Sequence, residues 1–320
     1  MAGILVYAEV ADARAAAIGL ELLSKARELG QVDAVALGPG AREAAAQLGA
    51  YGASRVFLND DPAFAEYLAE PATDCLAALV QRESPDLILF GFTSDGREVA
   101  GRLGARLDVG VISNVLDVSA ADGGYTAQVP YFGGARVANY RANNRPAIVL
   151  VRPKSFEASE SGGQAEMVEI EAAIAEGSRR ARISERHDEV SDQVNLEDAR
   201  IVVAGGRGLG GPENFALVEG LASALGGAAG ATRAIVDAGW VPYSFQIGQT
   251  GKTVKPGVYI AAGISGAMQH TVGMKGAKVI VAINKDAQAP ILKLADLGVV
   301  GDVTKILPKL TEAVKAKRGA

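Results

Sequence analysis

Cysteine and histidine are scarce in this sequence, and their scarcity excludes two kinds of site. The chain has one cysteine, Cys75, and two histidines, His187 and His270. A single cysteine forms no internal disulfide, and these three side chains supply no clustered set of metal ligands. We therefore expect a reducing, cytoplasmic setting and no metal centre.

A positive net charge and a long apolar run are also missing. Lysine and arginine number 32 against 37 aspartates and glutamates, a net charge of −5, so no global field attracts a polyanion. No apolar run approaches the ~18 residues that span a bilayer, and residues 1–10 lack the basic segment of a signal peptide. We expect no nucleic-acid partner and no direct membrane insertion, so any membrane contact goes through a partner protein.

What the sequence does have is an alternation of short apolar runs and helical patterns. Its length of 320 residues favours two domains. In the first half we expect strands at 4–8, 33–37, 55–58 and 86–90, and helices at 15–29, 42–48, 64–82 and 96–107. Such alternation predicts an α/β fold with a doubly wound, mostly parallel sheet. Strands bounded by glycine turns over 111–152 indicate an antiparallel extension of the same sheet.

A polar, charge-mixed stretch over 157–198 contains the boundary between the two domains. We expect an N-terminal α/β domain at 1–185, a linker at 186–198 and a C-terminal α/β domain at 199–320. In the second domain, strands are expected at 200–204, 234–236, 258–261 and 278–283, and a helix at 307–315.

The first of three glycine-rich loops, residues 205–211, follows a strand and precedes a helix that starts near Pro212. Closely spaced glycines let backbone N–H groups approach a phosphate, and the helix N-terminus adds positive potential. Gly206, Gly208 and Gly211 match the G-x-G-x-x-G pattern, but the next strand ends at Asp237, too far on for a dinucleotide fingerprint. A flexible turn without a ligand remains the alternative.

The second loop, residues 248–253, is not a P-loop, because Gln246 stands where that motif requires glycine. Its amides and the Thr250 hydroxyl still suit a phosphate or a polyol. The third loop, residues 262–270, places Ser265 and backbone amides at a helix N-terminus. His270 either donates a hydrogen bond to a ring carbonyl or is a structural histidine. All three loops are expected at the carboxyl ends of strands, where open α/β sheets bind ligands.

Taken together, the segments 205–208, 232–239, 246–252, 262–270 and 282–286 closely resemble the electron-transfer flavoprotein α subunit in order and spacing. The resemblance is dense over 198–320 and looser over 1–190. It implies that the C-terminal domain binds FAD and that the N-terminal domain packs against a β subunit in a heterodimer. It also implies that electrons pass from dehydrogenases, such as acyl-CoA dehydrogenases of fatty acid β-oxidation, to a membrane quinone oxidoreductase or another acceptor.

The resemblance also assigns roles to individual positions. Arg207 and the 248–251 loop would contact the FAD phosphates and ribityl chain, and Arg233 would lie over the flavin ring. Residues 265–270 would hold the pyrophosphate and reach the ring edge, so that Arg233 and His270 tune the flavin. The full set of cofactor-binding positions that it implies is Arg207, Thr232, Arg233, Ile247, Gly248, Gln249, Thr250, Gly251, Ser265, Gly266, Ala267, Met268, Gln269, His270, Asn284, Asp302 and Val303. Asn284 and Asp302 would serve the adenosine half.

No catalytic acid, base or nucleophile stands out, so we expect a redox carrier and not an enzyme that transforms a substrate by itself. Three alternatives remain. The chain could be the α subunit of a flavin-bifurcating electron-transfer flavoprotein linked to NADH and ferredoxin or flavodoxin, for which Tyr243 is an ambiguous sign. It could be a nicotinamide-dependent dehydrogenase built on residues 201–237, although no catalytic pair is evident. It could also be a non-catalytic nucleotide-binding scaffold.

Overall fold

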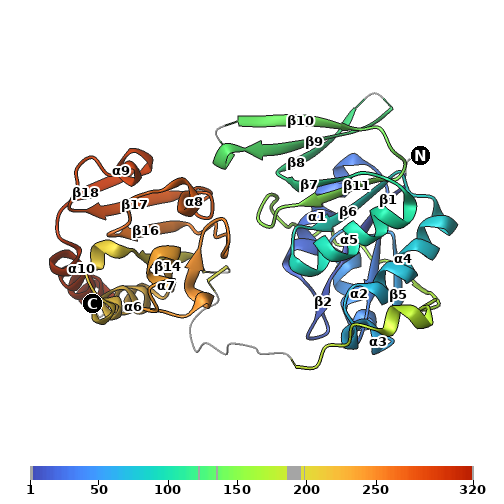
Figure 1. Cartoon of the computed structure of the whole chain (residues 1–320), viewed down its shortest axis with the longest axis horizontal. Coiled ribbons are helices and arrows are strands. Elements are labelled where there is room, and N and C mark those ends of the chain that lie inside the picture. Colours follow the sequence, from blue (N-terminus) through green and yellow to red (C-terminus); the bar gives the residue numbers. More distant parts are fainter. Residues whose placement is uncertain (1–2, 122, 135, 186–195, 198, 319–320) are drawn as a thin grey trace. The chain divides into compact units, whose positions relative to one another are not determined.

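The chain forms two compact units, residues 1–186 and 187–320 (Figure 1). The computed structural model describes residues 3–318 except for 122, 135, 186–195 and 198. The linker expected at 186–198 therefore falls almost wholly outside the described residues. Among the described residues, no helix has both the length and the apolar character needed to cross a bilayer.

Unit 1 is built on a seven-stranded sheet in which all neighbouring strands are parallel. The strand order is β12-β5-β4-β1-β6-β11-β7. These strands are β1 (Ile4–Ala8), β4 (Val32–Leu37), β5 (Arg55–Asn59), β6 (Leu87–Gly91), β7 (Val111–Val115), β11 (Ala147–Val151) and β12 (Glu166–Glu169). A short hairpin of β2 (Val10–Ala11) and β3 (Arg14–Ala15) follows β1. The expected doubly wound, parallel α/β fold is confirmed.

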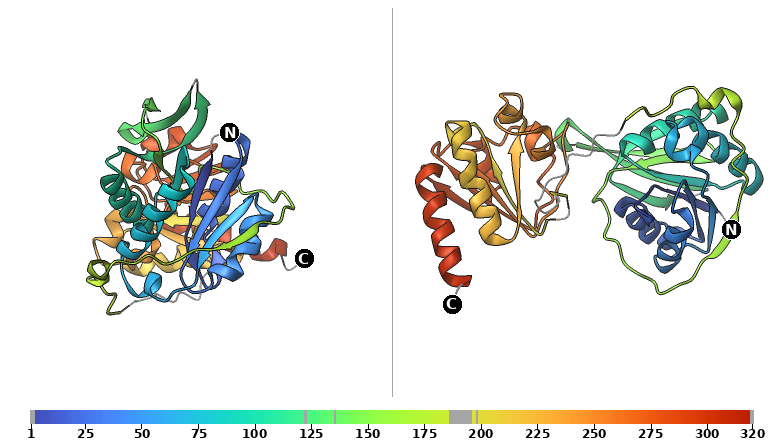
Figure 2. Two further views of the ribbon diagram at one scale, coloured as in Figure 1. Left: turned by 90° about the vertical axis from the view of Figure 1, so that its right-hand side faces the viewer. Right: turned by 90° about the horizontal axis from the view of Figure 1, so that it is seen from below.

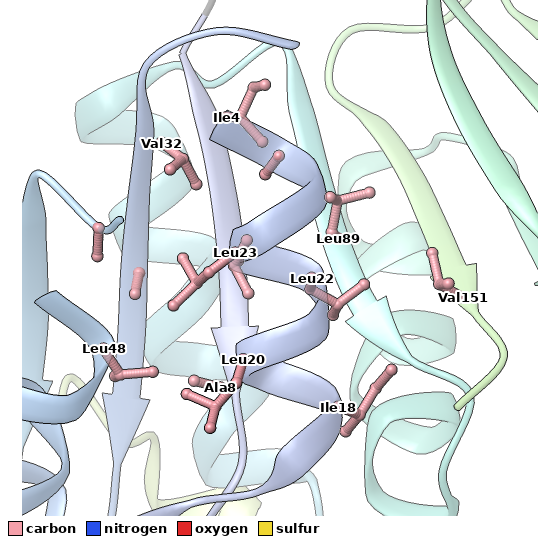
Figure 3. Close-up of a cluster of buried hydrophobic side chains, with 14 of the residues drawn as sticks. Ile4, Ala8, Ile18, Leu20, Leu22, Leu23, Val32, Leu48, Leu89 and Val151 are labelled. Atoms are coloured by element: carbon pink, nitrogen blue, oxygen red, sulfur yellow. The ribbon is translucent and has the colours of Figure 1, made fainter. Parts of the chain in front are cut away.

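Helices cover both faces of this sheet, because each presents an apolar stripe at helical spacing. The helices α1 (Ala17–Leu29) and α2 (Ala41–Ala50) pack on one face, and α4 (Glu70–Glu83) and α5 (Ser94–Leu107) pack on the other. Figure 3 shows how Leu22 and Leu23 of α1 meet Ile4 and Leu89 of the strands beneath. Each face thus has its own buried core.

Two expectations for unit 1 were wrong in part. The single helix expected at 64–82 is two helices, α3 (Ala63–Glu66) and α4, because the chain turns extended at Tyr67 and restarts with Pro71 in the first turn of α4. Within 111–152, β7 and β11 join the parallel sheet. The remaining strands, β8 (Asp117–Ala121), β9 (Gly124–Tyr131) and β10 (Arg136–Ala142), form a separate antiparallel sheet. The polar stretch after 157 contributes an edge strand, β12.

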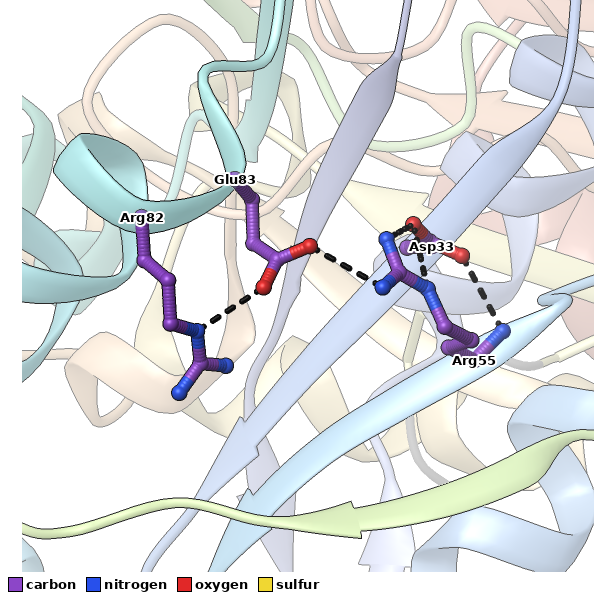
Figure 4. A network of polar contacts seen from close by, with 4 residues as sticks. All are labelled: Asp33, Arg55, Arg82 and Glu83. Atoms are coloured by element: carbon purple, nitrogen blue, oxygen red, sulfur yellow. Dashed lines mark hydrogen bonds and ion pairs between the residues drawn. The ribbon is translucent and has the colours of Figure 1, made fainter.

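A network of four charged side chains ties two strands of unit 1 to helix α4 (Figure 4). Arg55 of β5 lies 2.6 Å from Asp33 of β4 and 2.9 Å from Glu83 at the end of α4. Burial opposes ionisation of Glu83, but hydrogen bonds from Arg82 and Arg55 hold the pKa of its carboxyl below the usual value. The network thus links the amino ends of β4 and β5 to the carboxyl end of α4.

Cys75 lies on the inner face of α4 and is 1% exposed. Its Sγ lies 3.6 Å from the backbone carbonyl of Glu171. Burial raises the pKa of the thiol to about 12, so the side chain stays protonated and packs as a small apolar group.

Unit 2 has a six-stranded sheet, also parallel throughout, in the order β15-β14-β13-β16-β17-β18. The strands are β13 (Ile201–Gly205), β14 (Ala228–Thr232), β15 (Gln246–Ile247), β16 (Val258–Ala262), β17 (Val279–Asn284) and β18 (Leu297–Val300). The expected strand at 234–236 was wrong, because β14 ends at Thr232 and the chain continues as the short helix α7 (Arg233–Val236).

Helices cover both faces of this second sheet as well. The helices α6 (Phe215–Leu225) and α10 (Val303–Arg318) pack side by side on one face and share a core (Figures 1 and 2). The short helices α8 (Met268–Thr271) and α9 (Pro290–Leu294) follow β16 and β17, and Met274 and Ile291 close the core of the other face. The carboxyl ends of the strands remain open for a ligand.

Candidate cofactor site

A cavity of about 570 Å³ opens at the carboxyl ends of the unit 2 strands. Its size falls within the range of roughly 300–1,000 Å³ that is typical of small-molecule and cofactor sites. The cavity lies where chain order changes direction, with β14 on one side of β13 and β16 on the other, which is the usual binding position in open α/β sheets. The lining residues are Gly206, Arg207, Gly208, Thr232, Arg233, Ala234, Asp237, Gln246, Ile247, Gly248, Gln249, Thr250, Gly263, Ile264, Ser265, Ala267, Gln269, His270, Asn284, Asp286, Ala289 and Pro290.

Two glycine loops touch one another at the floor of this cavity. The backbone N–H of Gly208 donates to the carbonyl of Gly263 at 2.9 Å. A Cβ atom at position 208 would lie only 2.6 Å from the Cα of Gly263, which itself has φ +64°. Only glycine at these positions lets the loops after β13 and β16 approach so closely. Because the two loops are in contact, both of them line the same cavity.

The loop after β15 forms another wall and is held from two sides. The N–H of Gln249 donates to the carbonyl of Gln269 at 2.7 Å. The buried amide of Gln246 donates from Nε2 to Oγ1 of Thr250 at 3.1 Å. Because the Thr250 oxygen accepts this hydrogen bond, its own hydrogen remains available to a ligand. The Tyr243 hydroxyl donates a hydrogen bond to the Thr250 carbonyl, although most of the Tyr243 side chain is exposed.

Thr232, at the end of β14, carries the clearest sign that the cavity suits a polar ligand. Its side chain is 8% exposed, lines the cavity, and its Oγ1 has no hydrogen-bond partner within the protein. A buried hydroxyl without a partner costs free energy, so a polar ligand group in the cavity would relieve that cost. Next to it, Arg233 begins α7 and pairs through Nε with Asp237 at 3.1 Å, leaving a cation at the cavity wall.

His270 is buried between two protein partners. Its Nδ1 lies 3.0 Å from the carbonyl oxygen of Ile247, and its Nε2 lies 2.8 Å from the hydroxyl of Tyr259. Burial lowers the pKa of the imidazole to about 4, although the hydrogen bond to Ile247 acts in the opposite direction. In this arrangement neither ring nitrogen is left to donate to a flavin carbonyl. The expected hydrogen bond from His270 to the flavin ring stays a prediction, because both ring nitrogens have protein partners in this structure.

Comparison with known proteins covers both units. Residues 4–175 match the family model described as the electron transfer flavoprotein domain, and residues 195–275 match the electron transfer flavoprotein FAD-binding domain. The electron transfer flavoprotein subunit alpha of Mycobacterium tuberculosis (strain ATCC 25618 / H37Rv) is 45% identical, and the alignment covers 100% of both chains. The chain belongs to the electron transfer flavoprotein α-subunit family.

Relatives outside the mycobacteria agree with this assignment. The electron transfer flavoprotein subunit alpha of Bacillus subtilis (strain 168) is 37% identical over 98% of this chain and 97% of its own. Among solved structures, the glycosyltransferase SsfS6 of Streptomyces sp. SF2575 aligns over 100% of both chains with a TM-score of only 0.27 and 14% identity. A score that low gives no information about function.

FAD is the cofactor of this electron transfer flavoprotein chain, and the cavity fits it. The partnerless hydroxyl of Thr232 supplies a hydrogen-bonding group, and Arg207 and Arg233 supply cations for phosphates or a reduced ring. The glycine loops add backbone amides at strand ends. The apolar residues of the lining are glycine, alanine, isoleucine and proline, and a cavity that combines such residues with a few placed polar groups is typical of cofactor sites.

The cavity brings together most of the positions expected from the sequence. Twelve of them line it, namely Arg207, Thr232, Arg233, Ile247, Gly248, Gln249, Thr250, Ser265, Ala267, Gln269, His270 and Asn284. Five do not: Gly251, Gly266, Met268, Asp302 and Val303. Gly251 and Gly266 instead let loops turn closely against Gln246 and Ile291, and Met268 begins α8 with 48% of its surface exposed.

Asp302 has a structural role that the sequence did not indicate. Its Oδ1 accepts hydrogen bonds from the backbone N–H and the hydroxyl of Thr304, and its Oδ2 pairs with Lys285 at 3.2 Å. The hydrogen bond from the Thr304 hydroxyl, with help from Lys285, lowers the pKa of this carboxyl. Asp302 thus caps the start of α10, and Val303, 1% exposed, packs in the core behind it.

Ten further lining residues were not assigned a cofactor-binding role individually, although most of them lie in the glycine-rich loops or in the family segments. These are Gly206, Gly208, Ala234, Asp237, Gln246, Gly263, Ile264, Asp286, Ala289 and Pro290. Their common signal is position, since all but Gln246, the first residue of β15, lie at or shortly beyond the carboxyl end of a parallel strand. Gln246 contributes to the site through Thr250, which it orients with a hydrogen bond.

Proposed function

We propose that this chain is the FAD-bearing subunit of a heterodimeric electron carrier. A β subunit would pack against unit 1, and electrons would come from dehydrogenases such as acyl-CoA dehydrogenases in the cytoplasm. They would pass to a membrane quinone oxidoreductase or another acceptor. The family assignment and the "subunit alpha" names of the relatives support this reading, and FAD supplies the redox chemistry when bound.

The observation that carries the proposal is the absence of a poised acid–base pair among the described residues of the cavity. His270 is the one imidazole there, and protein partners occupy both of its nitrogens. Asp237 is paired with Arg233, and Asp286 accepts from the backbone of Gln288. Substrate-transforming enzymes place such groups within reach of a substrate proton. Groups arranged like these bind and orient a cofactor that exchanges electrons.

Within this function, Arg207 and the backbone amides of the loops would hold the FAD phosphates. Thr232 and Thr250 would donate hydrogen bonds from their hydroxyls, since the first has no partner and the second already accepts from Gln246. Arg233 would hold a positive charge at the flavin, and Asn284 would serve the adenosine half. Residues 206–208 and 263–265 would exclude water at the floor of the cavity.

Co-expression with a β subunit tests this function. The purified heterodimer is expected to be yellow, with one FAD per heterodimer, and to be bleached when a dehydrogenase and its acyl-CoA substrate are added without oxygen. Spectra and flavin content, measured after denaturation, give both results. A colourless heterodimer, or a flavin that no acyl-CoA dehydrogenase reduces, would contradict the proposal. Two FAD molecules per heterodimer would point to the bifurcating alternative.

A further inference from the structure

Tyr259 is a buried residue that neither lines the cavity nor belongs to one of the glycine-rich loops. It is the second residue of β16, has 0% of its surface exposed and packs in the core of unit 2. Its hydroxyl is 2.8 Å from Nε2 of His270. Buried tyrosine hydroxyls ordinarily have a partner, and here that partner is a cavity-lining residue.

The direction of each hydrogen bond in this group follows from what the atoms can do. The carbonyl oxygen of Ile247 can only accept, so Nδ1 of His270 carries the hydrogen. Because burial keeps the ring neutral, Nε2 has a lone pair and must accept. Tyr259 is therefore the donor, and burial keeps its phenol protonated by raising its pKa. The chain of donors runs from Tyr259 through His270 to Ile247.

These two hydrogen bonds connect three segments that meet at the cavity. Tyr259 belongs to β16, His270 to α8, and Ile247 to β15. The next residue, Gly248, packs so closely against α8 that a Cβ atom there would lie 2.6 Å from the carbonyl oxygen of Gln269. The loop of residues 248–250, which forms one wall of the cavity, is thus anchored through His270.

We propose that Tyr259 is a positioning residue of the FAD site, whose hydroxyl orients the His270 ring so that His270 holds Ile247 and the 248–250 loop in place. Without the hydroxyl, Nε2 becomes a buried acceptor with no partner. The ring relieves that by exchanging tautomers or turning, and either change removes the Nδ1 hydrogen from Ile247. Tyr259 acts on the cofactor only through His270, because it does not line the cavity.

Tyr259→Phe in the full-length chain, co-expressed with its β subunit, tests the proposal because it removes the hydroxyl and keeps the ring. We expect the dissociation constant for FAD to rise about 5- to 10-fold, the effect of one lost hydrogen bond. Ile260→Val is the matched control, since the neighbouring side chain is also buried but packs in the core of the opposite sheet face. It should leave FAD affinity unchanged. A second control, Tyr259→Phe in a His270→Gln background, should show no further loss.

Nitrogen NMR of the histidines measures which ring nitrogen of His270 carries the hydrogen. Removal of the Tyr259 hydroxyl would not change this tautomer if Tyr259 only filled space. The chain has only two histidines, so His187→Gln assigns the His270 signals. The FAD-loaded wild type should show hydrogen on Nδ1 alone, and Tyr259→Phe should show a mixture of tautomers. The proposal fails if wild-type His270 carries its hydrogen on Nε2, a result that needs no variant to fold. It also fails if Tyr259→Phe binds FAD as tightly as Ile260→Val does.

Discussion

At the scale of single residues, the cavity separates groups that supply charge from groups that supply position. Arg233 is two-thirds exposed and pairs with Asp237, itself largely exposed. Gln246 is buried and donates a hydrogen bond to Thr250, and Thr232 is buried with a hydroxyl that has no partner within the protein. The two classes respond to different perturbations, since a screened surface charge alters the redox balance of a ligand, whereas a buried hydrogen bond alters its affinity.

Replacing Arg233 with alanine is expected to lower the midpoint potential of the bound flavin. A positive charge at the cavity wall favours the more negatively charged reduced state, so its removal makes reduction harder. For an exposed guanidinium the shift is roughly 40 mV, which corresponds to about 1 kcal/mol for a one-electron step. Reductive titration beside a reference dye measures it. Arg200→Ala, exposed just before the amino end of β13, is the control, and equal potentials in both variants would refute the role of Arg233.

The buried imidazole of His270 makes stability depend on pH in a defined direction. Its pKa falls from 6.5 to about 4 in the folded protein, so between these values the unfolded chain binds a proton that the folded chain does not. The free energy of unfolding therefore falls as the pH falls from 6.5 towards 4, by roughly 2 kcal/mol at pH 5. Urea unfolding of the FAD-free protein at pH 7 and pH 5 measures this loss, and His270→Gln should lose less. Equal losses in both proteins would contradict it.

At the scale of elements, the glycine contacts between loops set the shape of the cavity. A methyl group at position 208 would overlap the backbone of Gly263, and overpacking of this kind forces the loops apart. Gly208→Ala is therefore expected to weaken FAD binding at least ~10-fold, the equivalent of about 1.4 kcal/mol. Titration of the apoprotein by flavin fluorescence gives the affinity.

Gly220 supplies the matched comparison. It lies inside α6, where an added Cβ meets nothing within 4 Å. Gly220→Ala should leave FAD affinity unchanged and raise the free energy of unfolding by about 0.5–1 kcal/mol, because alanine favours a helix interior. If Gly208→Ala binds FAD as well as Gly220→Ala does, the contact between the two loops does not shape the site.

The elements also show how far sequence reasoning reached. Strands such as Leu87–Gly91 are continuous apolar runs between loops, so the parallel sheet of unit 1 could be predicted. Strand Ala228–Thr232 could not, because its residues Ala-Ala-Gly-Ala-Thr have little strand propensity, and the apolar pair Ile235–Val236 attracted the assignment instead. The segment forms a strand because of tertiary packing, since all five of its residues are buried in the sheet.

The same limit applies to the site. Glycines and polar residues after strands pointed correctly to the loops, because local chemistry alone marks such positions. The partners of His270 could not be predicted, since Tyr259 and Ile247 meet it only through the pairing of strands and the turn into α8. The role of Asp302 at the adenosine half stays a prediction, because a capping carboxylate and a ligand-binding carboxylate look alike in sequence and this one caps α10.

At the scale of the whole molecule, the two units have separate interiors. Among the described residues, two hydrophobic clusters belong wholly to unit 1 and two wholly to unit 2. Only unit 2 contains the FAD cavity. A ligand that binds one folded unit stabilises that unit alone, by about 2.7 kcal/mol when its concentration is 100 times the dissociation constant.

Calorimetry of the full chain should therefore show two unfolding transitions, of which FAD raises only one. The transition that moves should be the one that Ile260→Val lowers, because Ile260 lies in the core of unit 2. Val80→Ala, in the core beneath α4 of unit 1, should lower the other. A single transition that moves as a whole with FAD would show instead that the units unfold together.

The burial of Cys75 has a consequence for the working life of a flavin protein. Reduced flavins exposed to air generate peroxide, which attacks thiolates first and thioethers more slowly. With its pKa near 12 and 1% exposure, the only thiol in the chain is withheld from that reaction. Among the described residues, oxidative damage then falls on methionine sulfur that solvent can reach, namely that of Met268 at the start of α8 and of Met167 in β12, 48% and 46% exposed. Ageing of this protein should therefore produce methionine sulfoxide at these two positions, a lesion that cells can reverse.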